Sequence, residues 1–439
     1  MSRFAGGVRS TFSSLRVRNY RLFFAGQVVS VTGTWMQMIA QAWLVLNITG
    51  SAADLGLVTA FQFLPTLLLG PYAGVLADRF DKRRILLTTQ AVSMTLALLL
   101  GVLAATGHVR LWMVVALAGG LGMVGAFDGP ARQTFVLEMV GPGNLANALS
   151  LNTVTMNVGR LFGPAVAGVV IAKWDLSVCF IANGLSYIAA IIALLLMRPH
   201  ELLTTERAQR AKGQLRDGFR YVWANPALRV PLLLMLAVGT LTYEFAVTMP
   251  VLAKRTFHVG AAGFGAMQSS MSIGAVVGGL LFATRTAPTF RRLVLAAIGF
   301  GTVVVALAMS PTYLVGMLVL PLVGVGSVLF VSLANATLQL ASPPEMRSRV
   351  MALYAVAFIG STPIGGPIIG WISQRFGVRW GLGVGGVAAV LGGIAAARSL
   401  RGVHGPTPTA EPAPAELDAS QVSAAADRPP RSGAPGVAA

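Results

Sequence analysis

Long apolar stretches alternate with short polar segments along almost the whole chain. A helix needs roughly 20 apolar residues to cross the hydrocarbon core of a bilayer. Twelve stretches of about that length can be placed, and together they predict an all-α membrane protein with twelve transmembrane helices. They lie near 22–46, 52–77, 85–106, 111–130, 149–172, 177–197, 228–252, 261–283, 293–309, 313–337, 350–373 and 380–397.

Composition and charge agree with a membrane protein. Of the 439 residues, 55% are hydrophobic and only 11% are charged. The net charge of +18 would indicate nucleic acid in a soluble protein. Here, however, most of the Lys and Arg residues fall in alternate polar segments, which lie on one side of the predicted membrane. This positive-inside pattern excludes nucleic acid as the partner, places both termini in the cytoplasm and predicts contact with membrane lipids.

The first apolar stretch carries polar residues at regular intervals. Their spacings of 3, 4, 3 and 4 put them on one helical face, which needs protein or water as a partner because lipid cannot satisfy it. Structural hydrogen bonds to other helices are one interpretation. The depth of the stripe favours a substrate pathway, to which Thr240 and Thr248 in the seventh stretch are added. The stripe consists of Gln27, Ser30, Thr34, Gln37 and Gln41.

The most informative polar segment is residues 74–86, Gly-Val-Leu-Ala-Asp-Arg-Phe-Asp-Lys-Arg-Arg-Ile-Leu. Retention of positive charge in the cytoplasm explains its cations. It does not explain Gly74, Asp78 and Arg79 in that order at a helix end. The segment resembles the signature loop between helices 2 and 3 of the major facilitator superfamily, although Asp81 replaces the second glycine of that pattern.

This resemblance implies two pseudo-symmetric six-helix bundles, the major facilitator fold, with a substrate site between them. An internal repeat with an offset of about 200 residues supports it: residues 143–151 precede a Gly-Pro helix, as residues 345–353 precede 360–370. We expect five regions. They are a basic N-terminus (1–20), an N-terminal bundle (21–198), a cytoplasmic linker (199–225), a C-terminal bundle (226–400) and a disordered cytoplasmic tail (401–439).

The fifth stretch contains small residues and a proline that allow close helix packing and a kink. It resembles the Gly-Pro-x-x-Gly-Gly motif on helix 5 of proton-coupled exporters, with Ala167 in place of one glycine. Residues 126–133, Ala-Phe-Asp-Gly-Pro-Ala-Arg-Gln, are similar to the drug and siderophore exporter branch. The resemblance therefore implies export. The motif residues are Gly159, Gly163, Pro164 and Gly168.

Two acids near span ends have simple structural interpretations. Asp54 lies at the start of the second stretch and fits a helix N-terminus. Asp128 lies four residues before Arg132 and can form a local pair. The resemblance implies more for Asp128, which is expected to join Lys82 and Arg83 in a cytoplasmic charge network. The implied conformational-switch set is Gly74, Asp78, Arg79, Lys82, Arg83 and Asp128.

Glu244 lies well inside the seventh stretch. An acid at the centre of a membrane helix costs about 2.5–3.5 kcal/mol on insertion scales, so it is retained when paired, hydrated or protonated. These conditions suit a proton-coupling group, and a structural acid bonded to a neighbouring helix is the alternative. Arg160 is the other charge within a span. Helix 4 lacks the central arginine that many proton-coupled relatives carry, which weakens a coupling scheme taken from those relatives. The coupling candidates are Glu244, Asp128 and Arg160.

We therefore expect a secondary transporter that exports an amphipathic small molecule by proton antiport with alternating access. It is expected to act as a monomer in the cytoplasmic membrane of a bacterium. A proton-coupled uptake permease and a non-transporting scaffold or lipid-handling protein of the same fold are the alternatives. The intact signature loop and the polar stripe favour transport.

Enzymatic activity and cofactors are not expected. The Gly120, Gly122 and Gly125 spacing matches a dinucleotide fingerprint only as a string, because no strand precedes it. No phosphate-binding Gly-x-x-x-x-Gly-Lys-Ser/Thr segment occurs, so the chain is not an ATPase. The four histidines lie in loops or the tail, and no Cys/His cluster has metal-ligand spacing.

Overall fold

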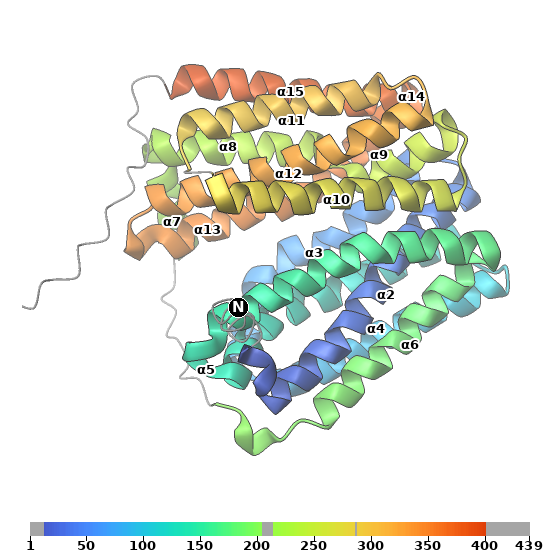
Figure 1. Ribbon diagram of the computed structural model, residues 1–439, viewed down its shortest axis with the longest axis vertical. Helices are drawn as coiled ribbons and strands as arrows, with labels where there is room; N and C mark the ends of the chain where they lie inside the picture. The colour runs from blue at the N-terminus through green and yellow to red at the C-terminus, as the bar shows by residue number, and fades with distance from the viewer. Residues whose placement is uncertain (1–12, 204–213, 286–287, 401–439) are drawn as a thin grey trace, which may run out of the picture.

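The computed structural model describes residues 13–203, 214–285 and 288–400. Its N-terminal helices lie side by side in alternating directions and form the lower bundle of Figure 1. They follow a short 3-10 turn, η1 (Ser13–Arg16). The helices are α2 (Arg18–Thr49), α3 (Ala52–Arg79), α4 (Lys82–Ala105), α5 (Leu111–Lys173) and α6 (Leu176–Leu195), and η2 (Pro199–Glu201) follows.

The C-terminal helices form the upper bundle of Figure 1. Between the bundles in the sequence comes the short helix α7 (Gln214–Ala224), which packs against α8 and α13 of the upper bundle. The upper bundle consists of α8 (Pro226–Leu241), α9 (Phe245–Val251), the π-helical turn η3 (Leu252–Thr256), α10 (Ala261–Arg285), α11 (Phe290–Ala308), α12 (Tyr313–Ala341), α13 (Pro344–Ile359), α14 (Thr362–Arg375) and α15 (Val378–Ser399).

These helices make the predicted twelve spans, because α5 reverses direction and supplies two of them. The 63-residue α5 turns at Gly141, whose φ of 70° favours glycine, and Pro142 then starts the next helix. The sequence predicts spans that end at residue 130 and begin again at 149, which is wrong for these boundaries. Both helices extend into residues 131–148 and meet at a single residue.

Two spans are broken, whereas the sequence analysis placed continuous helices at 228–252 and 350–373. One break separates α8 from α9 at Thr242–Glu244, and the other separates α13 from α14 at Gly360–Ser361. At the first break, side chains bond to other helices: Thr242 Oγ1 donates to the Gly385 carbonyl at 2.7 Å, and Tyr243 Oη donates to the Ser327 carbonyl at 2.5 Å. These tertiary bonds hold the interrupted backbone in place.

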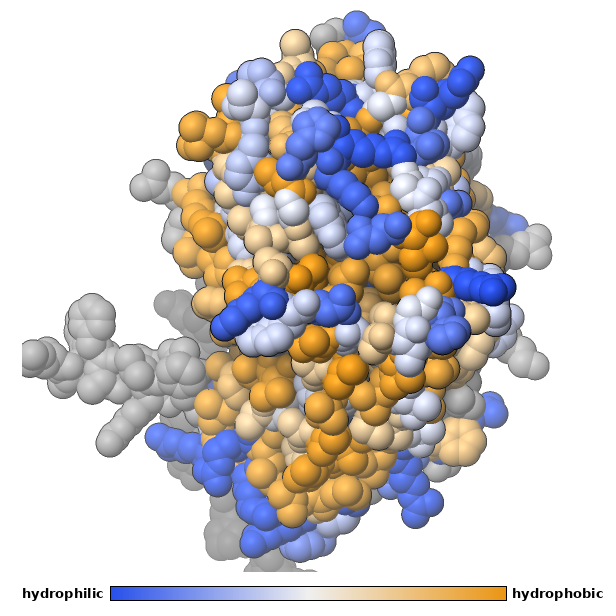
Figure 2. All heavy atoms as spheres, turned by 90° about the vertical axis from the view of Figure 1, so that its right-hand side faces the viewer, coloured by the Kyte–Doolittle hydropathy of each residue, from blue (hydrophilic) through white to orange (hydrophobic). Residues whose placement is uncertain are grey.

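The helix ends define two ends of the molecule. We call the end that carries Arg79 to Arg84 the basic end, and the end that carries the α2–α3 turn at Gly50 the opposite end. The basic end lies on the left of Figure 1, and Figure 2 looks onto the opposite end, where hydrophilic side chains gather in patches. This arrangement agrees with the positive-inside pattern of the sequence.

Candidate functional site

Two of the contacts between the bundles are seams of small residues, and the first joins α5 to α10. A Cβ atom added at Gly168 would lie 2.9 Å from Ala262 Cα, and one at Gly265 would collide with the Pro164 carbonyl. Ser269 Oγ donates to the Leu161 carbonyl at 2.8 Å. The predicted helix-5 motif thus lets two helix backbones from different bundles approach closely. We call this contact the α5–α10 seam.

The second seam joins α14 to α3 in the same manner. A Cβ atom at Gly370 would lie 2.7 Å from the Ala52 carbonyl, and one at Gly56 would collide with the Gly366 carbonyl. The Ala52 N–H donates to Gln374 Oε1 at 2.9 Å. We call this contact the α14–α3 seam. The repeat in the sequence therefore appears as two similar contacts, both in the halves of these spans nearest the opposite end.

Glu244 lies inside the α14–α3 seam. Its side chain is 2% exposed, and neither carboxyl oxygen has a hydrogen-bond partner among the described residues. A Cβ atom at Gly365 would lie 2.6 Å from Glu244 Oε1, and one at Gly366 would lie 3.6 Å from Oε2. The break in the seventh span points this acid at the glycines of α14. Only residues without side chains leave room for a carboxyl group there.

Arg160 lies beside the α5–α10 seam and is half-buried. Its guanidinium carbon is 5.8 Å from the ring centroid of Trp35, a cation–π distance. Its backbone carbonyl accepts a bond from Ser272 Oγ at 3.1 Å. Within the part of the chain that the structure describes, Arg160 forms no ion pair. Arg160 beside the first seam and Glu244 inside the second have side chains of opposite charge when both are ionised.

The polar stripe of α2 is largely turned toward neighbouring helices. Gln27, Ser30, Gln37 and Gln41 are buried, whereas Thr34 is exposed. Gln37 Oε1 accepts from Asn183 on α6 at 2.7 Å, and Gln41 Nε2 donates to Gln62 on α3 at 3.1 Å. These two bonds are interhelical packing contacts. The role of the stripe in a substrate pathway stays a prediction.

The threonines assigned to the pathway use their hydroxyl groups locally. Thr240 Oγ1 donates to the Leu236 carbonyl at 2.7 Å. Thr248 Oγ1 donates to the Glu244 carbonyl at 3.0 Å, on the other side of the break. Because the break lies between them, Thr240 and Thr248 do not belong to one continuous helix, and their role in a substrate pathway stays a prediction.

The signature loop departs from the family pattern at Asp81, and the structure gives this residue a local role. Asp81, in the place of a glycine, caps α4 by accepting a bond from the Arg84 N–H at 3.1 Å. Lys82 pairs with Glu138 at 2.6 Å, and Arg83 Nε donates to the Leu194 carbonyl at 2.8 Å. Arg79 is exposed. The side chains of Gly74 and Asp78 lie outside the described residues.

Asp128 has partners other than those expected. It accepts bonds from Thr89 Oγ1 at 2.9 Å, from Gln90 Nε2 at 3.1 Å and from Arg132 Nε at 2.8 Å. The expected pairing with Lys82 and Arg83 is wrong, because Glu138 and carbonyls of α6 bind those cations instead. The local i,i+4 pair with Arg132 is confirmed. Asp54 lies in the first turn of α3, as expected.

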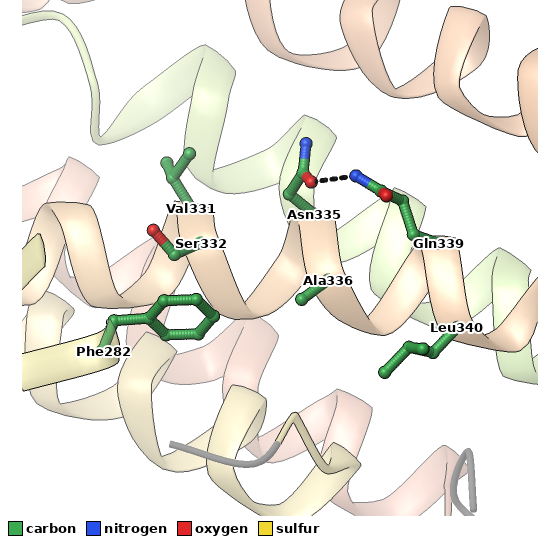
Figure 3. Close-up of a pocket in the computed structure, with 7 residues that line it drawn as sticks. All are labelled: Phe282, Val331, Ser332, Asn335, Ala336, Gln339 and Leu340. Carbon is green, nitrogen blue, oxygen red and sulfur yellow. Dashed lines mark hydrogen bonds between the residues drawn. The ribbon is translucent and has the colours of Figure 1, made fainter. Parts of the chain in front are cut away.

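A mainly apolar pocket on α12, whose wall also holds Ser332, Asn335 and Gln339, was not predicted from the sequence. It has a volume of about 520 Å³ and lies toward the basic end, between α10 and α12. Figure 3 shows Asn335 and Gln339 side by side, and Asn335 Oδ1 accepts from Gln339 Nε2 at 2.5 Å. Ser332, Asn335 and Gln339 are spaced by 3 and 4, so the rule used for the first span finds them. The lining residues are Phe282, Val331, Ser332, Asn335, Ala336, Gln339 and Leu340.

Comparison with known proteins identifies the family. The family model described as transmembrane secretion effector, of the major facilitator superfamily, matches residues 9–421. The chain belongs to this family. It is a membrane transporter and not an enzyme. Among the described residues, no group of His, Cys, Asp or Glu could hold a metal ion.

Several transporters are similar to this family member. The staphyloferrin A transporter of Staphylococcus aureus is 27% identical, over 60% of this chain and 66% of that protein, so the chain spans just under two thirds of its length. The multidrug efflux pump Tap of Mycolicibacterium fortuitum is 25% identical over 79% of this chain and 87% of that protein. The fold is similar to a bacterial homologue of the human lysosomal transporter Spinster in an inward-facing, occupied conformation. That likeness has a TM-score of 0.70 at 15% identity and covers 88% of this chain and 97% of that one.

Proposed function

We propose that this transporter exports an amphipathic small molecule in exchange for protons, as a monomer that opens alternately to the two sides of the membrane. The family and the name of the efflux pump among its relatives support export. The observation that carries the proposal is the placement of Glu244, a buried acid in a seam between the bundles that has no hydrogen-bond partner among the described residues.

The α14–α3 seam explains how a proton would be coupled to movement. A buried carboxyl group without a partner is tolerated far better neutral than ionised. Protonated Glu244 therefore fits the closed seam, and ionised Glu244 favours an open seam in which water reaches it. Proton binding at Glu244 would then close the opposite end, and proton release would reopen it.

The chemical difference between the two ends supports export. With the basic end in the cytoplasm, the closed seams lie on the outer side and the α10–α12 pocket lies toward the inner side. A substrate can then enter from the cytoplasm and contact Asn335 and Gln339 while the outer seams are shut. The switch loop, including Arg79 and Lys82, lies at the same inner end. Gln27 of the polar stripe, whose Oε1 has no partner among the described residues, is a further pathway candidate.

The membrane potential supplies enough free energy for this exchange. One charge moved across about 100 mV releases about 2.3 kcal/mol, which supports roughly a fifty-fold concentration gradient. Coupling to ATP is therefore not required.

Dye accumulation in cells tests the proposal. Bacteria that produce the transporter should retain less of a fluorescent amphipathic cation than cells that produce the Glu244→Gln variant. A protonophore should abolish the difference. Equal retention in both strains would contradict proton-coupled export of such compounds, and a difference that survives the protonophore would contradict the coupling alone.

Uptake of an anionic chelate is the second candidate, because one relative is named a staphyloferrin A transporter. Arg160, which forms no ion pair in the described structure, could contact a carboxylate-rich substrate. Accumulation of a labelled iron chelate by producing cells, absent in an Arg160→Gln strain, would favour uptake over export.

A further inference from the structure

A second hollow lies on the N-terminal bundle, between α4 and the first half of α5. Its volume is about 690 Å³. The wall is mainly apolar, with Val92 and Leu96 from α4 and Met123, Val124 and Phe127 from α5. We call this hollow the α4–α5 groove. It takes no part in the seams or in the α10–α12 pocket.

The α4–α5 groove faces the bilayer. Val92 is 41% exposed and Met123 is 51% exposed, although both belong to membrane spans. An exposed apolar residue on a span contacts acyl chains. The groove runs along α4 from Arg84 to Leu96, which at about 1.5 Å per residue is roughly 18 Å. One leaflet of the hydrocarbon core is about 15 Å thick, so the groove is long enough for one acyl chain.

A cation without a protein partner stands at the mouth of the groove. Three basic residues follow one another at the start of α4, and two are engaged: Lys82 pairs with Glu138, and Arg83 bonds to the Leu194 carbonyl. The Arg84 side chain is exposed and has no hydrogen bond or ion pair among the described residues. Asp81 is the acid on this rim, and its carboxylate caps the helix by accepting from the Arg84 N–H.

We propose that the α4–α5 groove binds one anionic phospholipid of the leaflet at the basic end. One acyl chain lies against Val92, Leu96 and Met123, and the phosphate is bound by the Arg84 guanidinium. An arginine suits this role because its planar N–H groups match phosphate oxygens. The apolar wall and the cationic mouth together match a charged headgroup on an apolar chain. This site is more specific than a general attraction of the basic end to acidic lipids.

Lipid retention by the full-length protein tests the site. Protein purified in detergent is mixed with phosphatidylglycerol or phosphatidylcholine, and the bound lipid is counted by native mass spectrometry. We expect phosphatidylglycerol to be preferred. Arg84→Gln should weaken its binding about fivefold, the equivalent of about 1 kcal/mol for one cation near an anionic lipid. Asp81→Asn should strengthen it, because it retains a capping side chain and removes the acid.

Two further variants separate the groove from its surroundings. Arg291→Gln removes an exposed cation from the start of α11 at the same end, and it should leave lipid binding unchanged. Val92→Trp should fill the groove and reduce retention of phosphatidylglycerol to the level of phosphatidylcholine. Circular dichroism and detergent solubility show that each variant is folded.

The last experiment locates the bound lipid by cross-linking. A photoreactive phosphatidylglycerol should cross-link to peptides that contain residues 84–96 or 120–127. Equal loss of binding in Arg84→Gln and Arg291→Gln, or cross-links confined to other spans, would overturn the proposal. Displacement of the lipid by the fluorescent cation at transport concentrations would also overturn it, because the groove would then be a substrate entry.

Discussion

The α5–α10 seam and the α14–α3 seam are built alike from equivalent helices of the two halves. In both seams, a Gly-Pro helix of one bundle lies against small residues of the other bundle, at the end of the molecule that we call the opposite end. Gly168 lies against Ala262, and Gly370 lies against Ala52. Their charged neighbours differ. Arg160 stacks on Trp35 beside the first seam, whereas Glu244 has no described partner inside the second.

This difference separates two requirements of a transporter. A gate needs two surfaces that can close and part, and glycine backbones provide these in both seams. Coupling needs a group that exchanges a proton. Among the described residues, the α14–α3 seam contains a buried acid, Glu244, whereas no acid is buried in the α5–α10 seam. We infer that the glycine contacts repeated in both seams form the gate. The acid Glu244, present in the α14–α3 seam, then couples this gate to protons.

The largest expected effect comes from removal of the acid. Glu244→Gln retains the size of the side chain but cannot carry a proton. In proteoliposomes with an imposed pH difference, the wild-type protein should concentrate substrate up to about tenfold per pH unit for each proton exchanged, because one pH unit is worth about 1.4 kcal/mol per proton. The variant should only equilibrate it, and its downhill exchange should persist. Glu345→Gln, which changes an exposed acid at the basic end, is the control. A Glu244→Gln protein that still concentrates substrate would break the comparison.

The next effect comes from forcing a seam apart. Gly370→Leu and Gly168→Leu each put a side chain against the backbone of the other bundle, where a Cβ atom alone would lie 2.7 Å from the Ala52 carbonyl or 2.9 Å from Ala262 Cα. Overpacking of about 1–3 kcal/mol should slow transport by roughly five- to a hundred-fold in both variants.

Labelling of an introduced cysteine shows whether the seam has opened. Thr59→Cys, in a Cys179→Ser background, should react faster with a membrane-impermeant thiol reagent when Gly370 is replaced. Gly125→Leu is the control, because a Cβ atom at Gly125 meets nothing within 4 Å. If only one of the two seam variants loses transport, the seams are not equivalent gates.

A smaller effect is expected at Arg160. A cation–π contact is worth about 1–2 kcal/mol when partly desolvated, so Arg160→Gln should raise the KM of an anionic or aromatic substrate about five- to thirty-fold. Arg160→Lys, which retains the charge, should restore part of this affinity. The pH-driven concentration ratio should not change. If Arg160→Gln also lost the pH-driven concentration ratio, both seams, and not the α14–α3 seam alone, would take part in proton coupling.

The smallest effect concerns the α10–α12 pocket, which lies away from both seams. Asn335→Leu removes one side of the bond to Gln339. Loss of one hydrogen bond is worth about 0.5–1.5 kcal/mol, so KM should rise about two- to ten-fold while the coupling ratio stays constant. The double variant with Gln339→Leu should be no worse than the worse single variant, because the two residues act together. Additive losses would show two independent contacts.

Local pattern was sufficient to predict the twelve spans and the close-packing motif around Gly163 and Pro164. The length of an apolar stretch decides whether it crosses a membrane, and neighbouring helices do not change that length. The breaks were not predicted. Nothing in the composition of 228–252 marks Tyr243, because the carbonyls that hold the interrupted chain belong to Ser327 and Gly385, far along the sequence.

The number and order of the spans, the concentration of positive charge at one end and the positions of the close-packing glycines could all be predicted from the amino-acid sequence. Which side chains meet depends on how the helices pack. It paired Lys82 with Glu138 and left Asp128 to Thr89, Gln90 and Arg132. It also placed Glu244 against Gly365. The physical reason is that hydropathy is a property of each segment, whereas the partner of a buried charge depends on the helices that pack around it.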